Sequence, residues 1–340
     1  MAVTIKDIAQ RAAVSTTTVS RILNGRKSGL PIREETRQNV LSIAAELGYK
    51  PNIMARALRG SRSSLIGVLA QNITSLFHSQ ILRGLNDVAV KRAYRVFLGH
   101  VQQQVEVAVD YGSMFEQYHA DGILIVGELA GDEEALETLL HQHRYVVGIS
   151  DRISRRTFPG VYADSVVGTR LAMDHLWSLG HRNILYVADP RLQDARLRAE
   201  VYEHYMGAHD AGENIRVIHT SRSFQASYET GMDIFANLAA LNHPTAISAA
   251  TDAIAIGLLE AAYQSRISVP DQISIVGFDD IDIAPFTIPP LTTVRQSGFE
   301  MGQAAATLLL DMIEQHLDSA TIEDVVLAPS LVVRQSSAAV

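Results

Sequence analysis

The sequence predicts an α/β protein with a small all-α helix-turn-helix head, followed by a two-lobed body of doubly wound parallel sheets. Three observations carry this prediction. The first 24 residues contain two short apolar patterns of helical spacing joined by a turn. From Ser64 onward, strand-length apolar runs alternate with amphipathic helical stretches. The length of 340 residues also suits two or three domains rather than one.

The N-terminal stretch TIKDIAQRAAVSTTTVSRILN is predicted to form two helices. Thr4 and Asp7 have the spacing of a capping box at the start of the first helix. Ser15 is a good N-cap for the second helix, directly after the turn. Two such short helices cannot bury a core of their own. Residues 34–47 carry an apolar stripe and are therefore predicted as a third helix.

The outer face of the second predicted helix is short, polar and basic, because its apolar residues point inward. Such a face would meet base edges if the helix entered a DNA major groove, where arginine suits guanine. A small helical bundle without a ligand is the alternative interpretation. The candidate base-reading residues are Thr16, Thr17 and Arg21, and the candidate phosphate contacts are Lys6, Ser15 and Thr18.

The net charge of −8 hides an asymmetry along the chain. Residues 1–62 hold eleven Lys and Arg against four Asp and Glu, and the remainder holds eighteen against thirty-three. A basic head on an acidic body is typical of a polyanion-binding module, although a solvated basic face could give the same count. The absence of cysteine excludes disulfides and thiolate metal sites. With no signal segment and no membrane-length apolar run, we expect a cytoplasmic protein without a membrane partner.

Several motifs resemble the lactose/galactose-repressor family of bacterial transcription regulators. In the head these are IKDIAQRAAVSTTTVSRILNG, ETRQNVLSIAAELGYKPN and ARALR, and in the body ITSLF, DHLWSLGHRNI, PTAISAATDAIAIG, ISIVGFDD and PPLTTVRQ. The resemblance covers nearly the whole chain. It implies a repressor that binds pseudo-palindromic operator DNA as a homodimer. It also implies control by a small-molecule effector, a sugar or related metabolite, and we expect no cofactor.

Residues 52–60, NIMARALRG, would form a helix too short to be stable alone in water. In the family this hinge helix folds on operator DNA and inserts an apolar side chain into the minor groove. Leu58 matches the inserted leucine, and Ala55 and Arg56 match its neighbours. Asn24 and Asn52 complete the candidate DNA contacts. The alternative is a plain linker with an incidental leucine.

The alternation of strands and helices in the body predicts parallel sheets with helices on both faces. The resemblance implies that two such sheets form the lobes of a periplasmic-binding-protein-like architecture built from discontinuous segments. The expected domains are a head at 1–50, a hinge at 51–61 and an effector-binding and dimerisation body at 62–340. Lobe 1 is expected at about 62–160 and 292–320, and lobe 2 at about 161–291 and 321–340.

Ligands of open α/β sheets bind beyond the carboxyl ends of the strands, so residues that follow strands are candidate contacts. An arginine flanked by carboxylates and amides can hydrogen-bond a polyol, and a phenylalanine can stack on a sugar ring. The resemblance implies that Arg198 clamps the effector, Asp279 pairs with hydroxyls, Asp151 is the acid of the first lobe, and Phe224 stacks. The candidate effector contacts are Asn72, Ser75, Phe77, Asp151, Arg198, Phe224, Thr251 and Asp279.

The chain departs from the family pattern at this site. Thr251 replaces an asparagine, Val201 stands where a glycine is expected, and Ser75, Leu76 and His78 replace the Asn-Pro-Phe-Phe form. These changes predict an effector that is smaller or differently hydroxylated than the commonest ones. Structural interpretations stay open for three candidates: a surface ion pair for Arg198, a turn for Asp279 and a core position for Phe224.

Two other function classes fit less well. A small-molecule binding protein without a DNA-binding role would share the two lobes but would not need the basic head. An enzyme is disfavoured because the twelve histidines are scattered without metal-ligand spacing. The chain also has no GxGxxG, P-loop or GxSxG motif. We therefore expect neither a catalytic residue nor a bound metal.

Overall fold

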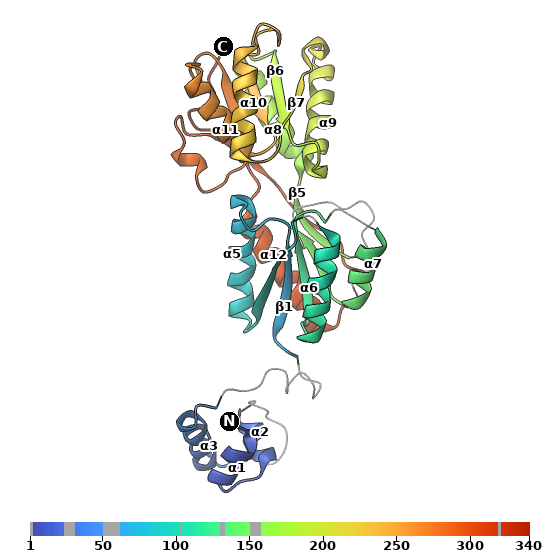
Figure 1. Ribbon diagram of the computed structural model, residues 1–340, viewed down its shortest axis with the longest axis vertical. Coiled ribbons are helices and arrows are strands. Elements are labelled where there is room, and N and C mark those ends of the chain that lie inside the picture. Colours follow the sequence, from blue (N-terminus) through green and yellow to red (C-terminus); the bar gives the residue numbers. More distant parts are fainter. Residues whose placement is uncertain are drawn as a thin grey trace. The chain divides into compact units, whose positions relative to one another are not determined.

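The structure is a computed structural model that describes residues 3–23, 31–49, 62–102, 104–129, 133–149, 158–318 and 321–340. The chain divides into two compact units, Met1–Ser63 and Ser64–Val340, which Figure 1 colours along the sequence. The hinge expected at 51–61 lies outside the described residues, so the predicted division into head, hinge and body stays a prediction at this point.

The described part of the first unit is a bundle of three helices, α1 Ile5–Arg11, α2 Thr16–Leu23 and α3 Glu34–Glu46. Ile8, Val19 and Val40, one from each helix, are fully buried in a single apolar cluster. The prediction of a helix-turn-helix completed by a third helix is confirmed.

Short-range hydrogen bonds start the first two helices. The Asp7 carboxylate accepts hydrogen bonds from the Thr4 amide and the Thr4 hydroxyl, both at 2.8 Å, and these bonds hold the pKa of Asp7 below its ordinary value. Ser15 Oγ accepts from the Thr18 amide at 3.0 Å at the start of α2. Ala13 has a φ of 52° between the two helices, which allows the sharp turn there.

The first sheet of the second unit has the strand order β11-β5-β4-β3-β1-β2, and every pairing in it is parallel. Its strands are β1 Leu65–Ala70, β2 Arg95–His100, β3 Gly122–Val126, β4 Val146–Ile149, β5 Gly160–Ala163 and β11 Val325–Leu327. Its helices are α5 Leu76–Lys91, α6 Val105–Gln117, α7 Glu133–Gln142 and α12 Gly298–Gln315. We call this sheet with its helices the first lobe.

Alternate residues of the first sheet pack into two separate cores, one on each face. Val68 and Leu124 belong to the core that contains side chains of α5 and α12. Their neighbours Leu69 and Ile123 belong to the core that contains Phe115 of α6. Because successive side chains of a strand point to opposite faces, fully apolar strands are buried from both sides by helices, as Figure 1 shows.

The second sheet has the strand order β12-β10-β9-β8-β6-β7, parallel except for the antiparallel β12 at one edge. Its strands are β6 Ile184–Ala188, β7 Val217–His219, β8 Ala246–Ala249, β9 Ser274–Asp279, β10 Thr292–Arg295 and β12 Ser330–Val332. Its helices are α8 Ser165–Ser178, α9 Gln193–Ala208, α10 Phe224–Ala236 and α11 Asp252–Gln264, with short 3₁₀ turns η1 Gly212–Asn214 and η2 Ala284–Phe286. This sheet and its helices form the second lobe.

The segments that cross between the lobes differ from the expected boundaries. Residues 292–295 were expected in lobe 1, but they form β10, which pairs with β9 of the second sheet. Residues 325–327 were expected in lobe 2, but they form β11, which pairs with β5 of the first sheet. Strand β5, Gly160–Ala163, likewise extends the first lobe past residue 160. Strands of three or four residues carry no pattern that names their partner, so tertiary pairing decides their sheet.

Helices α5 and α12 of the first lobe touch through their backbones. A Cβ atom on Gly84 of α5 would lie 1.9 Å from the carbonyl oxygen of Phe299, and one on Gly302 of α12 would lie 2.1 Å from that of Ile81. Only glycine permits such an approach, so the two helices pack together with no side chain between them at these points.

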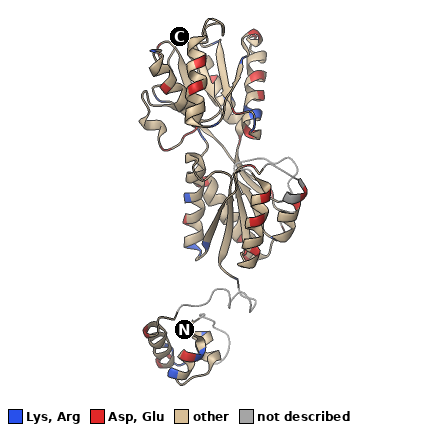
Figure 2. Ribbon diagram, viewed as in Figure 1, with Lys and Arg blue, Asp and Glu red and all other residues tan. Residues whose placement is uncertain are grey.

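Among the described residues, no helix has both the length and the apolar character needed to cross a bilayer. In Figure 2, acidic and basic residues both appear on the helices of the second unit and on those of the first unit.

Candidate functional site

The candidate DNA-reading face of the first unit lies on α2, opposite the residues that α2 buries. Val19 and Ile22 point into the core, while Thr16 and Thr17 are exposed and Arg21 is half-buried. The three candidate base-reading residues therefore lie outside the core, on a helix that packs against α1 and α3.

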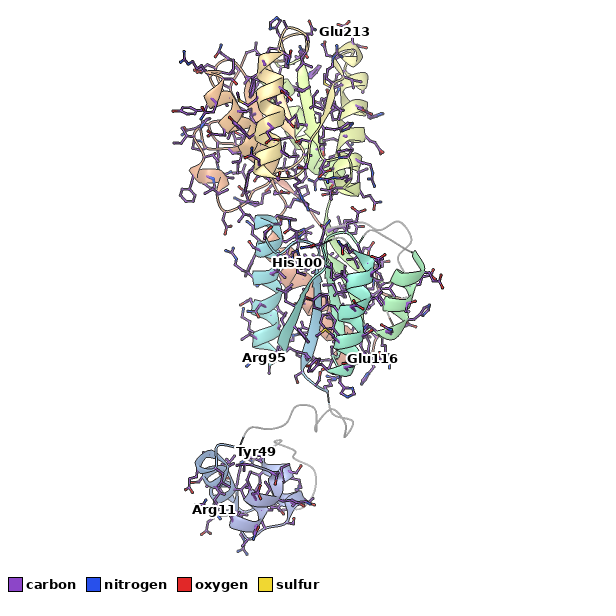
Figure 3. All side chains as sticks on the ribbon, in the orientation of Figure 1. Arg11, Tyr49, Arg95, His100, Glu116 and Glu213 are labelled. Carbon is purple, nitrogen blue, oxygen red and sulfur yellow. The ribbon has the colours of Figure 1, made fainter. Side chains whose placement is uncertain are left out.

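The candidate phosphate contacts lie at the starts of α1 and α2. Lys6 is exposed in the first turn of α1. Ser15 and Thr18 share a hydrogen bond between their hydroxyls at 2.9 Å, so both side chains also serve the start of α2. Arg11 instead joins α1 to α3 through an exposed ion pair with Glu46 at 3.1 Å (Figure 3). The remaining candidates, Asn24, Asn52, Ala55, Arg56 and Leu58, lie outside the described residues.

A pocket in the second unit holds about 860 Å³ of space, part of it open to solvent. It is lined by residues of both lobes, at loops that follow strands and at helix starts. In Figure 3, Arg95 and His100 mark the two ends of β2, and His100 marks the carboxyl edge of the first sheet. The first lobe contributes Asn72, Thr74, Ser75, Leu76 and Phe77, and the second lobe with the crossing segment contributes Asp194, Arg222, Ser223, Phe224, Thr251, Ala253, Asp279, Ile281 and Gln296.

Six of the eight predicted effector contacts line this pocket: Asn72, Ser75, Phe77, Phe224, Thr251 and Asp279. Phe224 is 46% exposed, which excludes the interpretation of a core residue. Asp151 lies outside the described residues. Arg198 does not line the pocket but lies behind it, in contact with two residues that do.

Hydrogen bonds within the first-lobe loop fix its shape. Asn72 Oδ1 accepts hydrogen bonds from the amide and the hydroxyl of Thr74, at 2.8 and 2.7 Å. Ser75 Oγ caps α5 by accepting from the His78 amide at 3.3 Å. Burial, and then the charge of Arg222, lower the pKa of His78 to about 4, so its imidazole is neutral at physiological pH. His78 Nδ1 lies 3.1 Å from the Asn72 carbonyl oxygen.

Arg198 is 1% exposed and lies behind the second-lobe side of the pocket, where it binds several residues. Its guanidinium donates to the Ala250 carbonyl oxygen at 2.7 Å, to Asp194 Oδ2 at 2.8 Å and to Ser165 Oγ at 3.3 Å. It also lies over the Phe278 ring, with Cζ 3.7 Å from the ring centroid. The interpretation of a surface ion pair is therefore excluded, and Arg198 acts on the pocket through its partners.

Gln296 links Arg198 to Asp279, the acid that is expected to hydrogen-bond effector hydroxyls. Its Nε2 donates to Asp279 Oδ1 at 2.6 Å, and its Oε1 accepts from Arg198 at 3.5 Å. The second carboxyl oxygen of Asp279 is thus left for a ligand, on a residue that lines the pocket. The backbone of Asp279 has a φ of 128°, a strained conformation for a side-chain-bearing residue, which is consistent with a functional position.

Two neighbouring acids are held partly protonated by burial. Burial, and then the charge of Asp252, raise the pKa of Asp279 to about 8. Burial also raises the pKa of Asp252 to about 6, although Asp252 accepts hydrogen bonds from the Ile281 amide at 2.9 Å and from the Thr293 hydroxyl. At neutral pH, Asp279 can therefore donate a hydrogen bond as well as accept one.

Sequence reasoning missed five polar lining residues: Thr74, Asp194, Arg222, Ser223 and Gln296. Arg222 follows β7 and Gln296 directly follows β10, so the rule that ligands bind beyond strand ends applies to both. Gln296 was missed because the segment 292–295 was not predicted as a strand. The described lining offers hydroxyl, amide, carboxyl and guanidinium groups and two aromatic rings, which suits binding of a polyhydroxylated ligand. No group of His, Asp and Glu among the described residues could hold a metal ion.

Comparison with known proteins shows the family. Residues 4–52 match the bacterial regulatory proteins of the lacI family, and residues 173–337 match the periplasmic binding protein-like domain. The HTH-type transcriptional regulator DegA of Bacillus subtilis (strain 168) is 31% identical, over 99% of this chain and 98% of its own.

Solved structures agree with this assignment. The lac repressor dimer bound to operator and the anti-inducer ONPF has a TM-score of 0.88 at 28% identity, with 100% of both chains covered. A LacI family transcriptional regulator from Enterococcus faecium with bound ribose has a TM-score of 0.71 at 28% identity, covering 81% of this chain and 99% of its own. The resemblance found in the sequence motifs and the predicted fold class are both confirmed. The chain belongs to the LacI family of bacterial regulatory proteins and is a transcriptional regulator.

Proposed function

We propose that this regulator is a repressor that binds pseudo-palindromic operator DNA as a homodimer, under the control of a sugar or related metabolite bound in the pocket. One observation carries the proposal: a single chain holds a packed helix with an outward polar and basic face and a pocket lined by hydrogen-bonding groups from two lobes. A regulator of this kind acts on the bacterial chromosome, in the cytoplasm. The operator-bound lac repressor dimer and the ribose-bound regulator support both halves of the proposal.

The DNA contacts follow from α2. Thr16, Thr17 and Arg21 would read base edges in the major groove, and a second protomer would read the other half-site. Phosphate contacts from Lys6, Ser15 and Thr18 would set the register of the helix on the duplex. The assignments of Asn24, Asn52, Ala55, Arg56 and Leu58, including minor-groove insertion of Leu58, rest on the sequence.

In the pocket, Asp279 and Gln296 would bind effector hydroxyls and Phe224 would stack on the ring. Asn72 and Ser75 would contact the same ligand from the first lobe, and Thr251 from the second. Arg198 would hold Asp194 and Gln296 in place rather than clamp the effector directly. The proposed role of Asp151 rests on the resemblance alone.

Contacts between the lobes supply the means of control. Gln80 Nε2 donates to Asp282 Oδ1 at 2.9 Å, Arg83 forms an ion pair with Asp282 at 2.9 Å, and the Gln193 amide donates to Glu128 Oε2 at 3.2 Å. An effector that touches both lobes favours the arrangement in which both sets of contacts form. Control of DNA binding then follows from the difference in operator affinity between lobe arrangements.

The test starts with a randomised-site selection on the full-length protein, followed by fluorescence anisotropy with the selected duplex. Arg21→Ala should weaken binding of that duplex by about 1–3 kcal/mol and relax the sequence preference at one base pair. Arg37→Ala, an exposed charge change on α3, serves as the control. Affinity for random duplex should fall steeply with salt.

A small-molecule binding protein without a DNA-binding role predicts the opposite result. It would select no sequence and would show no salt-dependent affinity for duplex DNA. Either of those results for the folded protein would exclude the proposed function.

A further inference from the structure

The charges that line the pocket do not balance. Its described lining has one cation, Arg222, and two acids, Asp194 and Asp279. Asp194 is neutralised from behind by Arg198, whose guanidinium lies 2.8 Å from Asp194 Oδ2. Asp279 is crowded by Asp252 and accepts from Gln296, and its raised pKa of about 8 leaves it mostly uncharged at pH 7. Within this described lining, the charge of Arg222 is the one that no neighbour compensates.

Arg222 is anchored by its backbone and free at its guanidinium. Its amide donates to Asp189 Oδ2 at 3.2 Å, which fixes the loop between β7 and α10. The nearby Asp189 carboxylate is already bound by the Arg191 guanidinium through two hydrogen bonds, at 2.7 and 2.8 Å. Within the described part of the chain, the Arg222 guanidinium has no hydrogen-bond or ion-pair partner. A half-buried guanidinium in this state is a ready binding group for an anion.

The positive charge of Arg222 reaches the first lobe. It is the largest electrostatic influence on His78, second only to burial in lowering the pKa of that residue. Ser75 and Ser223, the N-caps of α5 and α10, line the same pocket, and neither helix has an acidic residue in its first turn. Their amino ends add partial positive charge on both sides of the space that Arg222 faces.

Resting on the proposed function, we propose that Arg222 binds an anionic group of the effector, a carboxylate or a phosphate, so that the effector is an acidic or phosphorylated sugar. A planar guanidinium can hold either group through two parallel hydrogen bonds. The sugar ring then lies against Phe224, which is two residues away on the first turn of α10, and its hydroxyls reach Asp279 and Gln296.

Isothermal titration calorimetry of the full-length protein tests this with matched pairs of probes. The pairs are D-ribose with ribose 5-phosphate, and D-glucose with D-glucuronate and with glucose 6-phosphate. An anionic member should bind about tenfold or more tightly than its neutral partner, as a charge-assisted hydrogen bond implies. The glucuronate and phosphate arms decide which of the two anions the site takes.

Arg222→Gln should remove this preference, so that each anionic probe binds no more tightly than its neutral partner, while Arg222→Lys should retain part of it. Arg196→Gln is the matched control. Arg196 is an exposed arginine of α9 in the same lobe, it does not line the pocket, and its guanidinium donates to the Pro190 carbonyl oxygen. Because the Arg222 side chain has no bond to lose among the described residues, thermal unfolding of Arg222→Gln should match that of the wild type.

Three results would overturn the inference: equal affinity for neutral and anionic probes, a preference that survives Arg222→Gln, or binding of neutral sugars alone. If the wild type still binds the selected duplex, any of these three results leaves the proposed function standing. If no probe of either kind binds, both the inference and the carbohydrate part of the proposed function fail. Loss of duplex binding in the wild type would refute the proposed function itself.

Discussion

Asp279→Asn should remove a pH-dependent loss of stability from the second unit. The Asp279 side chain is only 7% exposed and faces Asp252, so burial and like charge raise its pKa from 3.8 to about 8. In the unfolded chain the same carboxyl ionises near 3.8. The stability that protonated Asp279 contributes is complete below that value and is lost as the pH rises through about 8. An asparagine does not ionise in either state, so the variant has no such loss.

The expected size of the effect follows from one proton. Between pH 4 and pH 8 the unfolded state releases that proton and the folded state keeps it, which costs about 1.4 kcal/mol of stability per pH unit. From pH 5 to pH 7 the wild type should therefore lose up to about 3 kcal/mol that the variant keeps. The side-chain oxygen of the introduced asparagine can still accept from Gln296, which keeps the geometry of the site.

Urea unfolding at pH 5, 6, 7 and 8 measures this difference through the fluorescence of Trp177, the only tryptophan, which lies on α8 of the same lobe. Asp189→Asn is the control. Burial raises the pKa of Asp189, but hydrogen bonds from Arg191 and from two backbone amides outweigh it, and the net shift is downward. Its contribution is present above the unfolded pKa and is lost only in acid, as the pH falls through the lowered pKa. Asp189→Asn should lower stability by a constant amount from pH 5 to pH 8. Parallel pH profiles for the wild type and Asp279→Asn would show that Asp279 ionises normally, and would refute the reasoning.

Three further predictions concern stability. Arg198→Met leaves Asp194 without its buried cation and should lower the free energy of unfolding in urea by about 3–5 kcal/mol. Arg198→Lys should restore only part of this stability. A loss below about 1 kcal/mol in Arg198→Met would contradict the role of Arg198 beneath the pocket. Gly84→Ala forces a Cβ atom against the Phe299 backbone and should destabilise the protein by about 1–3 kcal/mol. In the control Gly207→Ala the new Cβ has no atom within 4 Å, so this variant should be neutral or slightly stabilising. Equal effects of the two variants would argue against the close contact between α5 and α12. Ser15→Ala removes the cap of α2 and should lower the stability of the first unit by about 1 kcal/mol, which would appear as faster amide hydrogen exchange in α2. Ser15→Asp should keep the amides of α2 protected from exchange. Unchanged exchange in Ser15→Ala would contradict the capping role.

The features that were predictable from the sequence are those with local signals. The capping pair Thr4 and Asp7 and the cap Ser15 start helices where their spacing indicated, because these hydrogen bonds span only three residues. The alternation of apolar runs with amphipathic helices likewise predicted two sheets covered on both faces.

The features that were missed depend on contacts between distant residues. Strands β10 and β11 are four and three residues long, and only their pairing with β9 and β5 places them in a lobe. Arg198 could be predicted as important, but its distance from the ligand space depends on Ala250 and Gln296, 52 and 98 residues away. Arg222 follows β7, so the rule that ligands bind beyond strand ends applied to it, but the sequence does not show which residues of that loop line the pocket.

Helix α5 connects the pocket with the opposite end of the first lobe. It begins beside Ser75 in the pocket and runs for 16 residues, a length of about 24 Å. Just beyond its far end the Arg95 amide donates to the carbonyl oxygen of Ser64, the residue at which the second unit begins. A straight helix of this length that rotated by about 5° about its pocket end would move its opposite end by about 2 Å. A ligand that displaced the start of α5 would therefore also displace the point where the polypeptide enters this unit.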